Sequence, residues 1–167
     1  NDRAAEAIRV WNQDNPHQTM GLEPANIEKI KLWIEQRAKP DKESTTKIKL
    51  WQEQNHQCLY SGRYISFPQI ADGEVDIDHI YPLSLSGMND YLNKVLVFKS
   101  ENLAKEQKTP WQKWGGSEKY NEIVRRAQEW YGSNDSPLKA KLYKVRNTLD
   151  ETSFREEMRK FTESQLN

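Results

Sequence analysis

Cysteine is nearly absent from this chain of 167 residues, in which Cys58 is the only one. An intramolecular disulfide and a multi-cysteine metal site are therefore excluded. A structural zinc ion would have to take its four ligands from Cys58, His17, His56 and acidic residues, and we predict no such site. Cys58 is instead expected to be a small buried core residue. The lack of disulfides fits a reducing, cytoplasmic setting.

Long apolar runs are missing as well. Residues 95–98 are the apolar run Val-Leu-Val-Phe, which is far too short to cross a membrane. Residues 1–6 lack the apolar stretch of a signal peptide. Because hydrophobic residues make up only 35% of the chain, we expect a modest core and some helices that pack on parts of a larger protein. The length fits one domain with helical appendages, and we predict no membrane partner.

Neither sign of charge is in excess, since 25 Lys and Arg balance 25 Asp and Glu. The overall charge therefore does not indicate nucleic-acid binding. Residues 93–126 are an exception, with eight basic and four acidic residues and a local net charge of +4. A solvated helix face and contact with phosphates both explain such a segment. Within it, Trp111 and Trp114 are expected to pack in the core, with stacking on bases as the alternative.

Helical periodicity dominates the N-terminal part of the chain. Helices are predicted over residues 3–11, over 25–38 with the apolar residues Ile27, Ile30, Trp33, Ile34 and Ala38, and from a cap at Ser44 or Thr45 to about Asn55. Residues 12–23 are predicted to form a loop. Residues 39–42, which include Pro40, are expected to break the second helix.

After Cys58 the sequence pattern changes from helical periodicity to that of turns and short strands. We predict a turn at 60–62, a short strand over 74–78 and a second strand over 95–98. Ser100 is expected to cap a short helix that carries Asn102 and Lys105.

The C-terminal third is predicted to be helical. An apolar face is formed by Tyr120, Ile123, Val124, Ala127, Trp130 and Tyr131. Ser136 before Pro137, and Ser153 with Glu156, are predicted helix caps. The element order therefore predicts an α+β fold with a small β–β–α centre surrounded by several helices.

Asp76, Asp78 and His79 stand together at the end of the first predicted strand, and Asn93 and Asn102 follow around the second strand. An imidazole is a base near neutral pH, and Mg²⁺ prefers carboxylate and amide oxygens. Hydrolysis of a phosphodiester needs a base for the attacking water and positive charge for the phosphoryl and departing oxygens. Asp78 and His79, as strand neighbours, point apart unless the strand ends there. The alternative is a solvated strand end, with the asparagines holding turns or caps.

The segments around these residues resemble the HNH nuclease, or ββα-metal, motif. They are Cys-Leu-Tyr-Ser-Gly at 58–62, Val-Asp-Ile-Asp-His-Ile at 75–80, Asn-Lys-Val-Leu-Val at 93–97, Ser-Glu-Asn at 100–102 and Lys-Thr-Pro at 108–110. Together they resemble the HNH domain of the RNA-guided type II CRISPR effector nucleases, the Cas-nine family. The resemblance is strong over residues 47–115. It implies a ββα-metal core with a two-stranded antiparallel sheet.

The resemblance also implies a metal site. Asp78 and Asn102 fall at the positions of the family's Mg²⁺ ligands, and Mn²⁺ is expected to substitute. Asp76 falls beside the metal, with a supporting role or as an occasional ligand. Many HNH proteins have a histidine where this chain has Asn102, and an amide oxygen there favours Mg²⁺ over softer metals.

Three further positions carry roles implied by the resemblance. His79 falls at the general base. Asn93 falls at the middle asparagine, which is expected to hold the loop that orients His79. Lys105 falls where the family often carries a basic residue near the scissile phosphate.

For the whole chain, the resemblance implies a nuclease domain at 45–131 between helical linker regions at 1–44 and 132–167. It implies cleavage of the target DNA strand in a heteroduplex with guide RNA, in antiviral defence in the bacterial or archaeal cytoplasm. The implied partners are that DNA strand, the guide RNA, a RuvC-like nuclease domain and a recognition lobe. The alternatives are a free-standing HNH nicking or homing endonuclease and a non-catalytic nucleic-acid-binding module.

Overall fold

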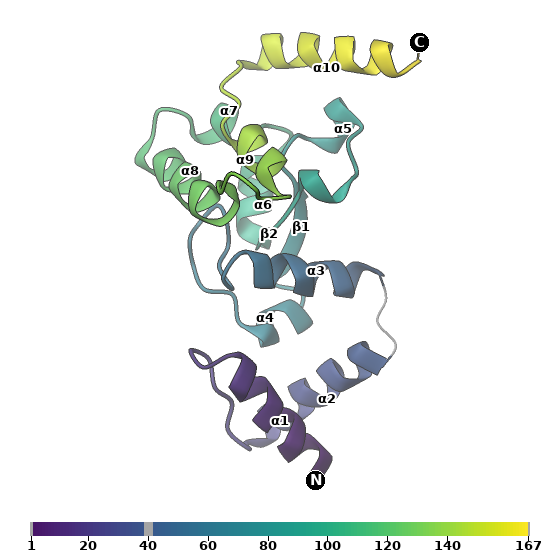
Figure 1. Ribbon diagram of the computed structural model, residues 1–167, viewed down its shortest axis with the longest axis vertical. Helices are drawn as coiled ribbons and strands as arrows, with labels where there is room; N and C mark the ends of the chain where they lie inside the picture. Colours follow the sequence, from purple (N-terminus) through teal and green to yellow (C-terminus); the bar gives the residue numbers. More distant parts are fainter. Residues whose placement is uncertain (1, 39–41, 167) are drawn as a thin grey trace.

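The computed structural model describes residues 2–38 and 42–166 (Figure 1). Its elements are α1 (Asp2–Asp14), α2 (Pro24–Ala38), α3 (Lys42–Glu53), α4 (Phe67–Ala71), β1 (Val75–His79), α5 (Leu83–Ser86), the 3-10 helix η1 (Tyr91–Asn93), β2 (Lys94–Phe98), α6 (Lys99–Lys105), α7 (Pro110–Trp114), α8 (Glu118–Tyr131), α9 (Lys139–Val145) and α10 (Glu151–Leu166). The sheet lies in the middle of the molecule, with α1 and α2 at one end and α10 at the other (Figure 1). No helix among the described residues is long and apolar enough to span a membrane.

The two strands form the predicted antiparallel pair. Val75 lies opposite Phe98 and His79 lies opposite Lys94. The helix α6 begins directly after β2 and packs on both strands. Strand, strand and helix thus form the ββα centre, and the predicted α+β fold class is confirmed. The long connection between the strands contains α5 and η1, and it lies beside the end of β1.

The strand β2 is protected on its outer edge by a side chain. The amide of Gln54, which follows α3, donates to the Leu96 carbonyl at 2.8 Å and accepts from the Leu96 N–H at 2.8 Å. Gln54 is buried, and its amide replaces the hydrogen bonds that a third strand would provide. The core continues from there through Trp51, whose ring stacks on Trp11 at 5.4 Å between centroids. Cys58 is buried, as predicted.

Several predicted helix caps are wrong. The helix α3 already begins by Lys42, so Ser44 and Thr45 lie inside it. Ser100 lies inside α6, which is preceded by Phe98. At α6, packing of the helix on both strands outweighs the local preference for a capping residue.

The two C-terminal caps are also misplaced. The helix α9 is preceded by Leu138, and Ser136 accepts from the Leu138 N–H at 3.1 Å instead of capping. Ser153 lies inside α10, where its N–H donates to the Asp150 carboxylate at 2.8 Å. An aspartate at the N-terminus of a helix is the better cap, since its charge also complements the helix dipole. The predicted helix break at 39–41 and the side chains of Trp33, Ile34 and Ala38 lie outside the described residues.

Sequence periodicity missed the short helices α4, α5, α7 and η1. Two of them carry a capping box followed by proline. Ser66 pairs with Gln69 at α4, and Thr109 pairs with Gln112 at α7. A helix of five residues is too short to show a periodic pattern of apolar residues, so the capping box is its only signal in the sequence.

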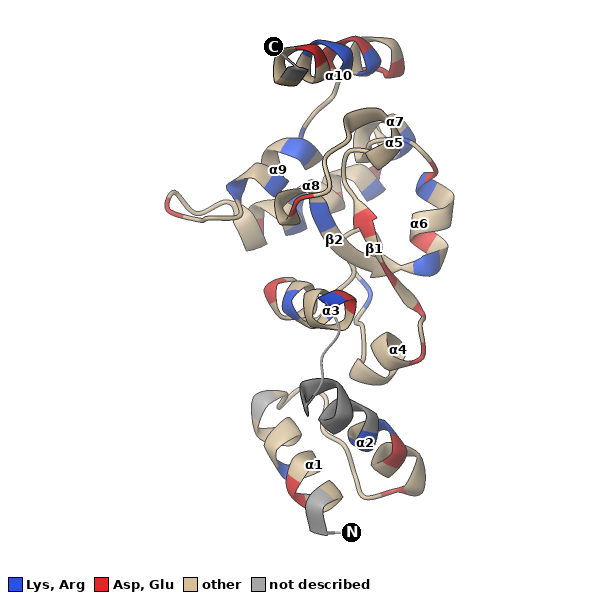
Figure 2. Cartoon of the chain, turned by 90° about the vertical axis from the view of Figure 1, so that its right-hand side faces the viewer, with Lys and Arg blue, Asp and Glu red and all other residues tan. Residues whose placement is uncertain are grey.

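The helix α10 is tied to the rest of the chain by two buried side chains, Phe154 and Met158. Figure 2 shows acidic and basic positions mixed along it. These include ion pairs of Arg159 with Glu156 and with Glu163. The helix is therefore a solvated element with a narrow apolar stripe, which continues to the partly exposed Phe161.

Lys141 of α9 is one of two lysines that are fully buried among the described residues, and Lys105 is the other. A carboxylate oxygen of Glu53 lies 3.8 Å from the Lys141 ammonium nitrogen, and the ring of Tyr91 lies 4.2 Å away. Tyr91 donates its hydroxyl to the same Glu53 carboxylate. Burial lowers the pKa of Lys141 to about 8. Because the unfolded chain holds this proton more tightly, the charged form opposes folding at neutral pH.

Stability is therefore expected to rise with pH through this lysine. Between about pH 8 and 10.5 the unfolded state keeps a proton that the folded state has released, and the gain amounts to roughly 3 kcal/mol. The difference in free energy of unfolding between wild type and Lys141→Met, measured by urea denaturation at several pH values, isolates this contribution. A difference that stays constant across the window would contradict the buried charge.

Candidate active site

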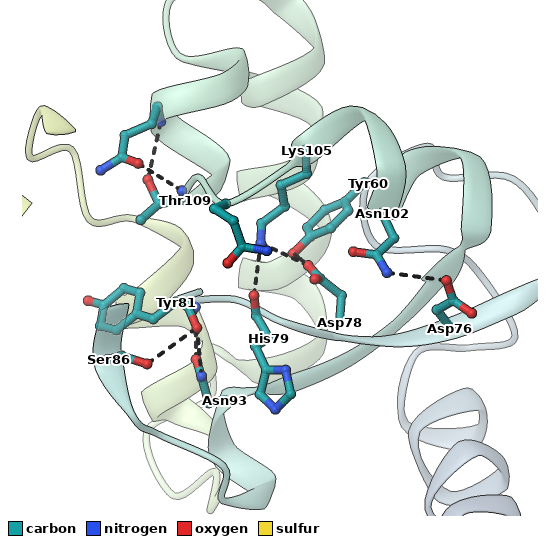
Figure 3. A network of polar contacts seen from close by, with 12 residues as sticks. Tyr60, Asp76, Asp78, His79, Tyr81, Ser86, Asn93, Asn102, Lys105 and Thr109 are labelled. Atoms are coloured by element: carbon teal, nitrogen blue, oxygen red, sulfur yellow. Dashed lines mark hydrogen bonds and ion pairs between the residues drawn. The ribbon is translucent and has the colours of Figure 1, made fainter. Parts of the chain in front are cut away.

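A small cavity of about 190 Å³ opens where β1 ends and α6 passes over it. The cavity is lined by Ile77, Asp78, His79, Pro82, Leu83, Asn102, Lys105, Glu106 and Gln107. Four of the predicted site residues thus meet at one pocket, although they are spread over two elements (Figure 3). Asp76 and Asn93, the other two, act on residues of this pocket from outside its lining.

The Asp78 carboxylate is buried and firmly held. Its Oδ2 accepts a hydrogen bond from the Tyr60 hydroxyl at 2.6 Å and forms an ion pair with the Lys105 ammonium at 2.9 Å. Both contacts converge on the same oxygen. Oδ1 is therefore the oxygen of this carboxylate that remains for a metal ion.

Asn102 is oriented by Asp76. Its amide nitrogen donates to Asp76 Oδ2 at 3.2 Å, and the amide oxygen points toward Asp78 (Figure 3). Lys99 lies 3.8 Å from the other oxygen of Asp76. Asp76 therefore fixes which end of the Asn102 amide faces the pocket.

The donor set fits a hard divalent ion. One carboxylate oxygen of Asp78 and the amide oxygen of Asn102 are ligands that suit Mg²⁺, which keeps several waters in its coordination sphere. The described residues contain no group of three or more His, Cys, Asp or Glu that could hold a metal. A site with few protein ligands is the kind that Mg²⁺ occupies together with substrate phosphates.

His79 is the last residue of β1, and its imidazole points away from the Asp78 carboxylate (Figure 3). The divergence is that of neighbouring residues on a strand. Nε2 of the ring lies 2.8 Å from Oδ1 of Asn89. The backbone carbonyl of His79 accepts from the Lys105 ammonium at 2.8 Å. The ring is half-buried.

Lys105 is almost entirely buried, with 1% of its side chain exposed. Its ammonium group joins the Asp78 carboxylate to the His79 carbonyl. Burial lowers the pKa of Lys105, and the Asp78 carboxylate opposes that shift. The lysine thus belongs to the wall of the pocket, and its contact with a phosphate stays a prediction.

Asn93 is fully buried and pins the connection that follows His79. Its Oδ1 accepts from the Tyr81 N–H at 2.9 Å. Its amide nitrogen donates to the carbonyls of Tyr81 at 3.0 Å and Met88 at 2.9 Å. This arrangement matches what an orienting residue must do, although the effect on catalysis stays a prediction.

Several basic side chains of residues 93–126 contact groups of the same chain. Lys119 pairs with Glu101 at 2.7 Å and Arg125 pairs with Glu122. Arg126 donates to the carbonyls of Leu59 at 2.9 Å and Tyr60 at 3.1 Å. Those carbonyls belong to the turn that carries Tyr60 to Asp78. The solvated or structural explanation therefore accounts for much of this segment.

The tryptophans of the same segment contact neighbouring rings. Trp114 lies 5.0 Å from the Tyr60 ring, and Trp111 packs edge-on against Tyr120 at 5.3 Å. Both are partly buried. Packing thus occupies at least one side of each ring, as the sequence analysis predicted.

The sequence did not single out Tyr60, although it stands in a segment that carries the HNH resemblance. Its contact with Asp78 spans 18 positions in the chain. Burial and the nearby Asp78 carboxylate raise the pKa of Tyr60 well above its usual range, so the hydroxyl keeps its proton and donates.

Replacement of Tyr60 by phenylalanine is expected to lower the free energy of unfolding by about 1.5–3 kcal/mol, because a buried hydrogen bond to a charged acceptor is lost. Urea denaturation measures this. Tyr64→Phe is the matched control, since the Tyr64 hydroxyl lies 3.3 Å from His56 at an exposed position. Equal effects of the two changes would contradict a special role for Tyr60.

Known proteins share this site region. Residues 58–111 match the family model described as HNH endonuclease. CRISPR-associated endonuclease Cas9 1 of Streptococcus thermophilus is 41% identical over 73 residues, which cover 42% of this chain and 6% of that protein. CRISPR-associated endonuclease Cas9 of Campylobacter jejuni is 42% identical over 79 residues, 46% of this chain and 8% of that protein. The chain therefore spans only a small part of these relatives.

A solved structure extends the likeness to the flanking helices. The crystal structure of Streptococcus thermophilus Cas9 in complex with the AGGA PAM aligns with a TM-score of 0.55 and 26% identity, over 93% of this chain and 15% of that one. These findings confirm the resemblance to HNH nucleases and to the CRISPR effectors that the sequence motifs predicted.

Proposed function

We propose that this chain, whose HNH domain is consistent with that of Cas9, supplies a Mg²⁺-dependent DNA endonuclease site to an RNA-guided effector. The site cuts the target DNA strand that is paired with the guide RNA and leaves a 3′-hydroxyl and a 5′-phosphate. The observation that carries the proposal is the meeting of Asp78, His79 and Asn102 at one small pocket at the end of β1.

His79 is the general base. A neutral imidazole takes a proton from the water that attacks phosphorus. In an in-line displacement the attacking and departing oxygens lie on opposite sides of the phosphorus atom. The opposite directions of the His79 imidazole and the Asp78 carboxylate support this assignment, because base and metal ligand then serve opposite sides of the phosphate (Figure 3).

Asp78 and Asn102 would hold the metal. A divalent ion bound there would stabilise negative charge on the phosphoryl and departing oxygens. Asp76 orients Asn102 through their hydrogen bond. Tyr60 and Lys105 hold the other oxygen of Asp78, which supports coordination through Oδ1 alone.

The remaining effector domains and the guide RNA are the partners in this proposal, and the bacterial cytoplasm is its location. The balanced charge supports it, because base pairing with the guide supplies specificity and the rest of the effector brings the DNA. A free-standing HNH endonuclease would have to bind duplex DNA by itself, with a steep salt dependence. The contacts of Lys119 with Glu101 and of Arg126 with the Leu59 carbonyl occupy two of the basic groups that such a binding surface would use.

The test is cleavage of one end-labelled strand offered alone, in a DNA duplex and in a hybrid with RNA. The chain is assayed as such and grafted in place of the HNH domain of a Cas9 relative. We expect Mg²⁺-dependent cutting of the guide-paired strand by the graft, with Mn²⁺ as a substitute, and its loss in Asn102→Ala. A graft that assembles on its target and leaves that strand intact would contradict the proposal. Preference of the chain alone for duplex DNA would favour the free-standing alternative.

A further inference from the structure

We propose that Asn89 is a positioning residue that fixes the tautomer of His79, with the proton on Nε2 and the free lone pair on Nδ1. The inference deepens the proposed function and rests on His79 being its general base. It assigns a direct partner to His79, whereas the sequence analysis predicted only that Asn93 holds the loop that orients His79.

The first step is the contact itself. Oδ1 of Asn89 lies 2.8 Å from Nε2 of His79. An amide oxygen has only lone pairs to offer, so the nitrogen that faces it must donate. A neutral imidazole carries one N–H, and that proton is then on Nε2. Nδ1 is left as the acceptor, which is the state a general base needs.

The second step is the support of Asn89 by its neighbours. Its side chain is exposed, but the backbone on both sides is tied to Asn93. The Met88 carbonyl accepts from the Asn93 amide at 2.9 Å, and the Asp90 carbonyl accepts from the Asn93 N–H at 3.0 Å. Asn93 therefore holds Asn89 from both flanks.

The turn before Asn89 is fixed as well. Gly87 ends α5 with φ +67°, a conformation that favours glycine, and its N–H donates to the Leu83 carbonyl at 2.9 Å. The Met88 N–H donates to the Ser86 hydroxyl at 3.1 Å. The asparagine thus approaches His79 from a segment with few remaining degrees of freedom.

These hydrogen bonds connect Asn93 to His79 through Asn89. The buried Asn93 sets the position of Asn89, and Asn89 sets the proton on His79. A base whose tautomer is set by a hydrogen-bonding neighbour is the arrangement that nucleophile-activating sites use in general. Asn93 thus acts on the base through Asn89 as well as through the backbone of Ile80 and Tyr81.

The experiment compares Asn89→Leu with Asn89→Asp. Leucine has a similar size and no acceptor, whereas aspartate keeps an acceptor oxygen at the same place. Long-range ¹H–¹⁵N NMR on the 167-residue chain reads the tautomer of each histidine at about pH 8, where an ordinary imidazole is neutral. The chain has three histidines, and His79→Gln assigns the His79 signals.

We expect the Nε2–H pattern for His79 in wild type and in Asn89→Asp. In Asn89→Leu the ring ¹⁵N shifts should move toward the tautomer mixture of a solvent-exposed imidazole. Asn134→Leu changes an exposed asparagine between α8 and α9 and is expected to leave the His79 signals unchanged. A wild-type His79 protonated on Nδ1, or shifts that do not move in Asn89→Leu, would overturn the proposal.

Cleavage by the chain grafted into a Cas9 relative gives the second readout. Asn89→Leu should lower the cleavage rate constant on the order of 10- to 100-fold with target binding unchanged, and Asn89→Asp should restore most of it. If His79→Ala abolishes cutting and Asn89→Leu does not slow it, the positioning role fails. If His79→Ala itself cuts normally, the proposed function fails, while the NMR result still decides the tautomer.

Discussion

Replacement of His79 by alanine is expected to lower the rate constant of DNA cleavage by about 10²- to 10⁴-fold. The magnitude is that of a positioned general base. His79 ends β1 beside the pocket, and its ring is held by Asn89 at 2.8 Å. Without the imidazole, the attacking water loses the neutral base that takes up its proton. Single-turnover cleavage of the guide-paired strand by the grafted effector measures the loss.

Metal binding by His79→Ala is the control for this result. The oxygens of Asp78 and Asn102 are held by other residues, so calorimetric Mn²⁺ or Mg²⁺ binding to the effector–target complex should persist. His17→Ala removes an exposed histidine from the loop after α1 and should cut like wild type. Unchanged cutting by His79→Ala would remove the assignment of the base, whereas loss of metal binding would show that the histidine acts as a ligand.

The centre of the fold could be predicted from sequence because its signals are local. The run at 95–98 has the β-branched and aromatic residues of a buried strand, and β2 covers Lys94–Phe98. Asp78, His79 and Asn102 stand in the order of a motif along the chain, and the structure brings them to one pocket. The same reasoning misplaced the caps at Ser100 and Ser136, because a helix end is decided by packing as much as by the capping residue.

The supporting contacts could not be predicted, because they join residues that no periodicity relates. Tyr60 reaches Asp78 from a turn that Arg126 of α8 anchors. Asn89 reaches His79 from a loop whose course depends on Asn93. Sequence reasoning assigned an orienting role to Asn93, and the structure shows a further residue between it and the base. Hydrogen bonds of this kind become visible only when the distances are known.

The burial of Lys105 could not be predicted from the sequence either. As a lysine on a short helix it reads as a solvated cation that reaches for phosphate. The structure instead encloses it, with 1% of its side chain exposed, against an Asp78 carboxylate that is 9% exposed. The register of α6 on the sheet decides this, and that register is a property of packing.

Replacement of Lys105 by methionine is accordingly expected to lower the free energy of unfolding by about 3–5 kcal/mol. Methionine fills a similar volume, so the main loss is the partner of a buried carboxylate. Lys99→Met is the matched control on the same helix, because Lys99 is 56% exposed and lies 3.8 Å from Asp76. An exposed pair at that distance contributes about 0–1 kcal/mol. Urea denaturation of both variants measures the difference.

A double-mutant cycle separates the ion pair from the packing of Lys105. Asp78→Asn removes the charge that Lys105 neutralises while keeping the shape of the side chain. If the pair dominates, the double variant Asp78→Asn with Lys105→Met loses much less stability than the two single changes added together. Strict additivity would mean that Lys105 acts through its packing alone, and a loss as small as that of Lys99→Met would mean that its ammonium reaches water. A strong coupling has a consequence for the proposed site, because the lysine that stabilises the fold then also helps to decide which oxygen of Asp78 would be left for a metal ion.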